Sequence, residues 1–263
     1  MLSVLLTVLF TLSLGWSQVE VYHLRYEQII NRSSAVFTQG LYFHEGQLFE
    51  SSGKYSKSFI QKGTLDASQG FVKSTKLFFP KKYFAEGSCY CADKHWVLTW
   101  KSGFVFRYDD ELTQLTPAFK IQSEGWGLAC FQNNLLLSNG SSSLFILEPE
   151  SGRILKKYEV EAGGIYLNGL NELEVVGDFA LINRWYMNEI LIFDLNKGQL
   201  VEIWQAEDFA SAFQGEDARM MDSMNGIAWN SQAGELWATG KLWPGYLRIR
   251  VPPQSLLNQF LPE

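Results

Sequence analysis

Short apolar or alternating segments recur along the chain after residue 18, and turns rich in Gly, Asn, Asp and Ser separate them. Alternation places successive side chains on opposite faces of a strand, so the pattern predicts β-strands and no long amphipathic helix. Only 205–221 has helical character, and we interpret it as a segment inserted before the last repeat. Among the predicted strands are 47–50, 96–100, 135–138, 179–183 and 235–239.

Five segments of the chain repeat one order of residues: a small or polar residue, Gly, an apolar pair, a turn, a strand and a polar or aromatic ending. Their anchor positions are separated by 47, 40, 45 and 54 residues. A period of about 40–50 residues made only of strands is typical of the four-stranded blade of a β-propeller. The anchors are Gly40, Gly87, Gly127, Glu172 and Gly226.

The length of the chain fits five such blades, because 263 residues less a leader of 17 leave 246, or about 49 per repeat. An open ring would expose unpaired strand edges, so we expect the blades to close on themselves. The C-terminal run 246–251 is predicted to pair with an N-terminal strand at about 19–24. The chain is therefore predicted to be all-β, with residues 18–263 forming a single closed five-bladed β-propeller and no second domain.

Residues 1–16 form an apolar run without charge, which is short for a membrane span and suits the apolar region of a secretory signal. Gly15 and Ser17 supply small residues for cleavage before Gln18. We therefore predict a signal peptide at 1–17 and a mature chain that is secreted, periplasmic or lumenal and does not stay in the membrane. The missing basic segment at its start leaves an uncleaved anchor as the alternative.

Charge and composition exclude several classes of function. The net charge is −6, the isoelectric point is near 5.2 and no basic stripe is present, so we predict no nucleic-acid partner. The three His and three Cys residues lack the spacing of metal ligands, so no metal site is predicted. Cys89 and Cys91 point to the same face of a predicted strand. One of them forms a disulfide with Cys130 if the strands are neighbours; the alternative is that all three cysteines are buried thiols.

Aromatic residues make up 15% of the chain, more than one core usually requires, and a binding cleft is one place for the surplus. In a propeller the first strand of each blade lines the central channel, so the starts of the repeats converge at one end of the axis. Any single polar or aromatic residue at the start of a repeat is equally well explained by packing or solvation. As a set they predict a pocket bordered by Gln39, Glu86, Trp126, Asn171, Glu172 and Asn225.

At these positions the sequence resembles the glutaminyl-peptide cyclotransferases of the plant and bacterial type, a family of five-bladed propellers. The resemblance spans about 36–250, and its motifs occur in one order along the chain. They are FTQG (37–40), FESSG (49–53), YFAEG (83–87), LTW (98–100), GWGL (125–128), GLNELE (169–174), NRW (183–185), NGIAW (225–229) and TGKLWP (239–244).

The resemblance implies an enzyme that converts the N-terminal glutaminyl residue of peptides or proteins to pyroglutamate and releases ammonia. It implies Glu86 as the general acid and base, with Asn171 and Lys241 as polar contacts. The oxyanion of the reaction needs a stabilising group, which we expect to be Lys241 or the amide of Asn171. The implied reaction requires no cofactor for catalysis, although family members can hold a structural calcium ion in the central channel. The implied substrate-binding residues are Phe37, Gln39, Phe84, Trp100, Trp126 and Trp185.

Some positions depart from the family's pattern. Ala85 stands where Gly is usual, Ser88 and Cys89 stand where an apolar residue and Thr are common, and Asn139 stands where relatives often have Asp. They flank the implied site and bear on substrate preference and rate. Glu172 and Glu174 follow Asn171, and we expect one to face the channel and the other to face away.

The chemistry needs one carboxylate that takes a proton from the attacking amine and returns it to the departing amide nitrogen, inside walls that hold the substrate in its ring-closing conformation. A non-catalytic propeller that binds peptides or glycans through the same aromatic mouth is the alternative. A calcium-dependent lactonase would need several carboxylates at the axis, where this chain has mostly aromatics and amides. We expect the protein to be a monomer.

Overall fold

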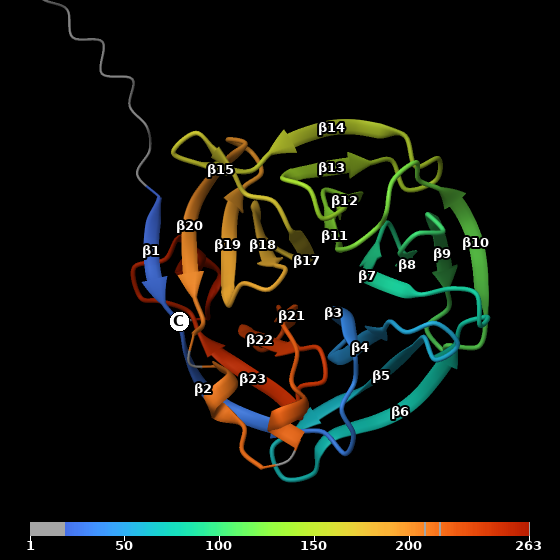
Figure 1. The fold of residues 1–263 in the computed structure, drawn as a ribbon, viewed down its shortest axis with the longest axis horizontal. Coiled ribbons are helices and arrows are strands. Elements are labelled where there is room, and N and C mark those ends of the chain that lie inside the picture. Colours follow the sequence, from blue (N-terminus) through green and yellow to red (C-terminus); the bar gives the residue numbers. More distant parts are fainter. Residues whose placement is uncertain (1–18, 208, 216, 263) are drawn as a thin grey trace, which may run out of the picture.

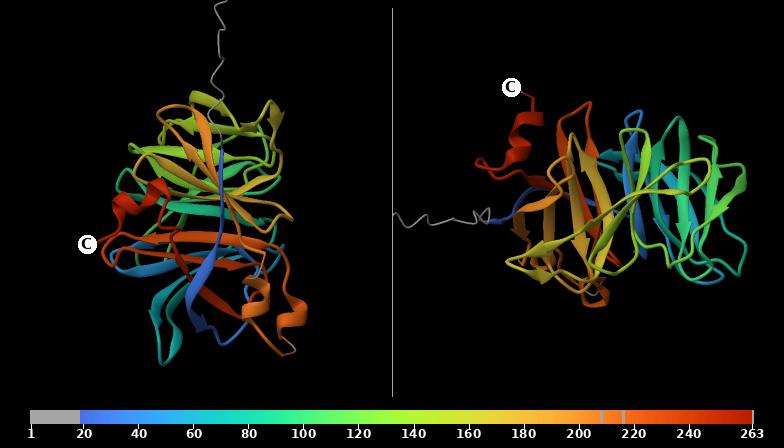
Figure 2. Two further views of the ribbon diagram at one scale, coloured as in Figure 1. Left: turned by 90° about the vertical axis from the view of Figure 1, so that its left-hand side faces the viewer. Right: turned by 90° about the horizontal axis from the view of Figure 1, so that it is seen from above.

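In the computed structural model, which describes residues 19–207, 209–215 and 217–262, the sheets radiate around a central axis (Figure 1). The signal peptide predicted at 1–17 lies outside the described residues. Within the described part of the chain, no helix is long and apolar enough to cross a membrane. The fold is a five-bladed β-propeller, as predicted, and the two side views show the sheets standing next to one another as blades of a disc (Figure 2).

The four strands of each blade run antiparallel, and the first strand of every blade lies innermost (Figure 1). In four blades the strands follow chain order from the axis outward, whereas the outermost strand of the fifth comes from the N-terminal part of the chain. The first blade comprises β3 (Thr38–His44), β4 (Gln47–Ser52), β5 (Phe59–Asp66) and β6 (Gly70–Phe78). The second comprises β7 (Ala85–Cys91), β8 (Lys94–Thr99), β9 (Phe104–Tyr108) and β10 (Leu115–Lys120). The third comprises β11 (Leu128–Phe131), β12 (Asn134–Ser138), β13 (Ser143–Leu147) and β14 (Ile154–Glu159).

The fourth blade comprises β17 (Leu170–Val176), β18 (Phe179–Arg184), β19 (Glu189–Asp194) and β20 (Gln199–Gln205). A short hairpin, β15 (Glu161–Ala162) and β16 (Ile165–Tyr166), connects it to the third. The fifth comprises β21 (Met224–Asn230), β22 (Glu235–Gly240), β23 (Gly245–Arg250) and β2 (Arg25–Asn31). The five strands predicted from alternation are confirmed, and they are the second strands β4, β8, β12, β18 and β22.

The ring closes through the N-terminal part of the chain, but not through the predicted residues. β2 pairs with β23 from Arg25 opposite Arg250 to Asn31 opposite Gly245, whereas β1 (Glu20–His23) pairs in parallel with β20 of the fourth blade. The closing strand must lead directly to β3, so the segment nearest β3 in the chain fills that place. The earlier segment covers the edge of β20, which would otherwise be unpaired.

A buried polar network fastens the first blade to the fifth where the ring closes. Glu50 on β4 is fully buried and accepts hydrogen bonds from Arg32 (2.6 Å), Gln61 (2.7 Å) and the Tyr246 hydroxyl (2.8 Å). Arg32 comes directly after β2 and also lies over the Tyr246 ring, 4.4 Å from its centre. Because the carboxylate is paired and fully hydrogen-bonded, its burial is tolerated.

The segment predicted to have helical character forms no α-helix. After β20 ends at Gln205, the chain makes two single 3₁₀ turns, η1 (Phe209–Ala212) and η2 (Asp217–Met220), before β21 begins. Gly215 adopts a φ of +94° between them, a conformation that ends a helix. Phe209 nonetheless buries its ring in the core, which anchors the insertion. A third turn, η3 (Leu256–Phe260), follows β23.

The core is divided into five apolar clusters, one at each interface between neighbouring blades. The cluster between the first and fifth blades, for example, contains Leu41, Leu48, Trp237 and Tyr246. Trp237 is buried there, and Trp229 packs against the neighbouring cluster. Much of the aromatic content therefore fills the spaces between blades.

A disulfide bond joins Cys91 at the end of β7 to Cys130 on β11, with their Cα atoms 5.2 Å apart. It crosses the interface between the second and third blades, and it selects one of the pairings left open by the sequence. Cys89 remains a buried free thiol.

We expect the double variant Cys91→Ala/Cys130→Ala to lose about 2–4 kcal/mol of unfolding free energy, because the bridge closes a long loop in the unfolded chain. The measurement is denaturant-induced unfolding of both proteins without reductant. Thiol titration of the denatured wild type should find one free thiol per chain, and three would contradict the assignment.

Candidate active site

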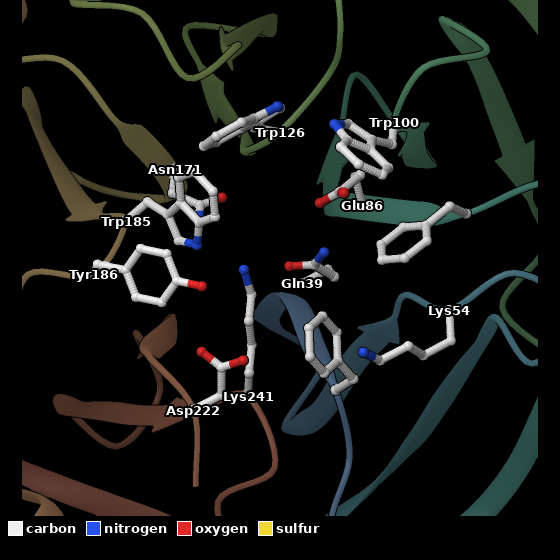
Figure 3. A pocket seen from close by; sticks show the side chains of 12 residues that line it. Gln39, Lys54, Glu86, Trp100, Trp126, Asn171, Trp185, Tyr186, Asp222 and Lys241 are labelled. Atoms are coloured by element: carbon white, nitrogen blue, oxygen red, sulfur yellow. The ribbon is translucent and has the colours of Figure 1, made fainter.

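A cavity of about 270 Å³ opens at the end of the channel where the inner strands begin (Figure 3). All nine residues predicted for the site line it, although they come from all five blades. Three further residues, Lys54, Tyr186 and Asp222, complete the wall. The predicted nine are Phe37, Gln39, Phe84, Glu86, Trp100, Trp126, Asn171, Trp185 and Lys241.

A break in strand pairing presents the polar residues to this cavity. The register of the inner strand shifts between Thr38 and Gly40, between Ala85 and Ser88, and between Leu170 and Leu173. Gln39, Glu86 and Asn171 lie within these shifted stretches, and all three line the cavity. A bulge re-aims a side chain that would otherwise follow the strand's alternation.

A glycine follows Gln39, Glu86 and Trp126, and the closeness of the next blade requires it at each of these points. A Cβ added to Gly87 would lie 2.5 Å from the Leu128 nitrogen, and one added to Gly127 would lie 2.0 Å from the Asn171 oxygen. The Gly87 N–H also donates to the Trp126 carbonyl at 2.7 Å. The repeated Gly of the sequence therefore marks the point where neighbouring inner strands touch.

Glu86 is the buried carboxylic acid of the cavity, with only 5% of the residue exposed. Burial raises the pKa of its carboxyl well above the usual value, the charge of Glu124 raises it further, and the charge of Lys241 lowers it. The Glu86 carbonyl accepts a hydrogen bond from the Ser51 hydroxyl at 2.6 Å, which holds the backbone in place. Such a group exchanges protons closer to neutral pH than an exposed Glu does.

Lys241 directly follows β22 and is nearly as buried as Glu86. Burial lowers the pKa of its ammonium, while the charges of Glu86 and Asp222 raise it. Figure 3 shows its amine pointing toward the middle of the cavity, and its nitrogen lies 5.5 Å from the centre of the Phe37 ring. The site thus pairs one acid and one base of opposite charge in water-poor surroundings.

The walls of the cavity are aromatic rings packed on one another. Trp126 and Trp185 meet edge to face with centres 5.4 Å apart, and Phe84 lies 5.4 Å from Trp100 on the opposite side. Tyr186 stacks on Trp185 at 4.6 Å, and both are exposed, so they form the rim. Flat rings on both sides suit a small substrate that must be held in one conformation.

Glu124 fixes the orientation of two of these rings, and sequence reasoning did not single it out. Its Oε2 accepts hydrogen bonds from the indole N–H of Trp100 (2.7 Å) and of Trp126 (3.0 Å). It stands directly before the GWGL motif, which was the available signal. Tyr186 and Lys54 likewise follow the NRW and FESSG motifs, whereas Asp222 lies in the insertion, where no motif marked it.

Two predicted residues lie beside the cavity rather than in it. Asn225 donates to the Gln39 side-chain oxygen at 3.3 Å and to the Thr38 carbonyl at 3.0 Å, so it positions Gln39. Glu172 is fully buried and accepts from the N–H groups of Leu41 (3.2 Å) and Ile227 (2.8 Å).

The expectation that Glu172 and Glu174 face opposite ways is wrong. Both accept N–H groups of β21, Glu172 from Ile227 and Glu174 from Trp229, since residues two apart in a strand share a face. Burial raises the pKa of both carboxyls, to about 7 for Glu174.

The fold and the cavity define a class of protein: a five-bladed β-propeller whose aromatic pocket encloses a buried carboxyl and a buried amine. The sequence profile described as "Glutamine cyclotransferase" matches residues 2–251. The chain belongs to this family.

Individual proteins agree with the family assignment. A curated glutaminyl-peptide cyclotransferase of Arabidopsis thaliana is 31% identical over 221 residues, which are 83% of this chain and 68% of the relative. The crystal structure of Myxococcus xanthus glutaminyl cyclase superposes with a TM-score of 0.78 at 26% identity, over 89% of this chain and 98% of that one. Regucalcin from Agrobacterium tumefaciens, at 8% identity and a TM-score of 0.54 over 89% and 96% of the chains, shares the fold alone.

Proposed function

We propose that this chain is a glutaminyl-peptide cyclotransferase, which converts N-terminal glutaminyl residues of peptides or proteins to pyroglutamyl residues and releases ammonia. The observation that carries the proposal is the buried Glu86 carboxyl with its raised pKa, enclosed with the Lys241 amine in an aromatic cavity. The family to which the chain belongs supports the same reaction.

The first task of the site is to hold the substrate in its ring-closing conformation. The α-amine and the γ-carboxamide belong to the same residue, so orientation replaces the encounter of two molecules. We assign this task to the indoles of Trp126 and Trp185 on one side and to Phe84 and Trp100 on the other, since their rings form the walls. Gln39, held by Asn225, is assigned to the substrate's amine or amide.

The second task is proton transfer. The α-nitrogen forms a bond to the γ-carbonyl carbon, and the ionised Glu86 takes a proton from that nitrogen. The carboxylic acid then returns the proton to the γ-amide nitrogen, whose bond to carbon breaks as ammonia leaves. A raised pKa suits both steps, because the group must accept and release a proton near neutral pH.

The third task is stabilisation of the oxyanion that forms on the γ-carbonyl oxygen. We assign it to the Lys241 ammonium, because a full positive charge in a buried site acts strongly on a developing negative charge. Asn171, also buried and lining the cavity, is assigned as a second hydrogen-bond donor. A propeller that only binds peptides or glycans would gain nothing from burying this carboxyl and amine, so the binding alternative is not favoured.

We propose that the reaction uses no metal ion. Calcium prefers six to eight oxygen ligands. The channel carboxylates of Glu172 and Glu174 instead accept backbone N–H groups, whose positive ends point to where a cation would bind. These residues therefore do not fit a calcium ion.

The direct test measures ammonia release from a Gln-initiated dipeptide, with and without a chelator. We expect activity on the Gln peptide, none on the corresponding Asn peptide, and the same rate after chelation. Absence of ammonia release would contradict the proposed function, whereas loss of activity on chelation would contradict only the metal-free chemistry.

We also propose that the protein works as a monomer in an oxidising compartment outside the cytosol. The twelve residues of the cavity come from one chain, and the Cys91–Cys130 disulfide is of the kind that persists in secreted or lumenal proteins. The uncharged apolar run at 1–16 supports export.

The variant Glu124→Gln tests the electrostatic part of the site. Because the Glu124 charge raises the pKa of Glu86, its removal should move the acidic limb of the kcat/KM profile to lower pH. Glu124→Ala, which also removes the acceptor of both indoles, should raise KM in addition. Kinetics across the pH range measure both effects, with Glu148→Gln, at a side chain that is 43% exposed on the surface, as control. An unchanged profile in Glu124→Gln would refute the assignment.

A further inference from the structure

Two histidines and an aspartate gather at the opposite end of the first and second blades from the active site. His44 is the last residue of β3, His95 lies on β8, and Asp110 follows β9. Gln39 of the cavity and His44 are five residues apart on β3, about 16 Å along the strand. The cluster is therefore separate from the cavity.

The ligand atoms of the three side chains converge on one point. His95 Nε2 is 2.5 Å from Asp110 Oδ1, His44 Nε2 is 3.9 Å from the same oxygen, and all three atoms lie within 4.8 Å of one another. Among the described residues, this is the one group of three His, Cys, Asp or Glu side chains with such spacing. The Asp110 carboxylate is 63% exposed, so the point is open to solvent on one side.

Aromatic residues hold both imidazoles in place. The Nδ1 atom of His95 is hydrogen-bonded to the Tyr42 hydroxyl at 2.6 Å, and that hydroxyl is 2.7 Å from the hydroxyl of Tyr108. The His44 ring stacks on Tyr90 with centres 3.6 Å apart. A hydrogen bond to the second ring nitrogen is the support that metal-binding histidines commonly have, because it fixes the tautomer and the direction of the ring.

The charges around the cluster favour a cation. Asp93 and Glu45 lie near Tyr90, on which the His44 ring stacks, so that together with Asp110 three carboxylates surround the position of an ion. Lys62 is the nearby positive charge that acts against it.

We propose that His44, His95 and Asp110 form a binding site for a divalent transition-metal ion, with Zn²⁺ as the ion that two imidazoles and a carboxylate suit. Ligand atoms about 2.1 Å from a tetrahedral ion stand about 3.4 Å apart. His44 and Asp110 must approach by about half an ångström, His95 and Asp110 must separate by about one, and the two imidazole nitrogens must reach the same spacing. The exposed Asp110 carboxylate and the partly exposed His44 ring supply these movements. Water completes the site, and the ion ties the first blade to the second.

The test is isothermal titration of the full chain, without an affinity tag, with ZnCl₂, together with absorption spectra of Co²⁺ at the same site. We expect one ion per chain. His44→Phe keeps the ring stacked on Tyr90 but removes the nitrogen, so it should lose the Zn²⁺ isotherm and the Co²⁺ absorption. Tyr42→Phe, which removes the support of His95, should weaken binding by about 10–100-fold.

His23 is the matched control, because it is exposed on β1 and is the one histidine of the sequence outside the cluster. His23→Phe should bind Zn²⁺ as the wild type does. Absence of saturable binding in the wild type, or unchanged binding in His44→Phe, would overturn the proposal. Ammonia release is measured in parallel and is expected not to change with His44→Phe, so the outcome does not depend on the proposed cyclase function.

Discussion

Glu86→Gln is expected to fold normally and to lose about 10²–10⁴-fold in kcat for a Gln-initiated peptide. The substitution keeps the shape of the side chain but removes the group that accepts and returns the proton. The cavity walls do not change, so KM should change much less than kcat. Ammonia release measures the rate, and circular dichroism with thermal unfolding verifies the fold.

Glu150→Gln is the control for Glu86→Gln, because the Glu150 carboxylate is exposed on the surface and its loss should leave the rate unchanged. Wild-type turnover in Glu86→Gln would remove the carboxylate from the mechanism, even if the fold and family stand. A loss of activity accompanied by a large drop in melting temperature would be structural in origin, and Glu86→Asp, which retains the carboxyl, then separates the two causes by its residual pH-dependent rate.

Lys241→Met is expected to lower kcat/KM by about 10²–10³-fold, because it removes the positive charge that faces the developing oxyanion. Methionine preserves much of the length and apolar stem of the buried side chain. The pH profile carries a second signature. The Lys241 charge lowers the pKa of Glu86, so its loss raises that pKa and moves the acidic limb of kcat/KM to higher pH.

The direction of that displacement is opposite to the one expected for Glu124→Gln, and the pair of profiles tests the electrostatic assignment without reliance on absolute rates. Lys197→Met, at an exposed lysine of the fourth blade, is the control for loss of a positive charge. A Lys241→Met profile displaced to lower pH, or a rate equal to that of the wild type, would contradict the assigned role.

The part of the site that lies on the inner strands could be predicted because the repeat itself builds it, whereas the other wall residues and Lys241 were implied by the resemblance to the family. A residue at the start of a blade's inner strand reaches the axis whichever blade carries it, so Gln39, Glu86 and Asn171 could be grouped without knowledge of their distances. The Gly that follows Gln39 and Glu86 supported the grouping, since Gly40 and Gly87 mark where adjacent inner strands meet.

Residues outside the repeated positions could not be found in this way. Glu124 matters because its carboxylate lies between two indoles from different parts of the second and third repeats, which only the packed structure brings together. Asp222 enters the cavity wall from the insertion, whose path follows no repeat. The same reason hid the cluster of His44, His95 and Asp110, whose spacing in the chain has no ligand pattern.

The sequence by itself determined the all-β class, the five blades and the polar and aromatic set at one end of the axis, because alternation and period are local properties repeated five times. Only the tertiary structure decided which strand closes the ring, which cysteine pairs with Cys130 and how far burial raises the pKa of Glu86. Those outcomes depend on which surfaces meet across blade interfaces. Contacts between segments far apart in the chain are set by packing, and no pattern within one segment encodes them.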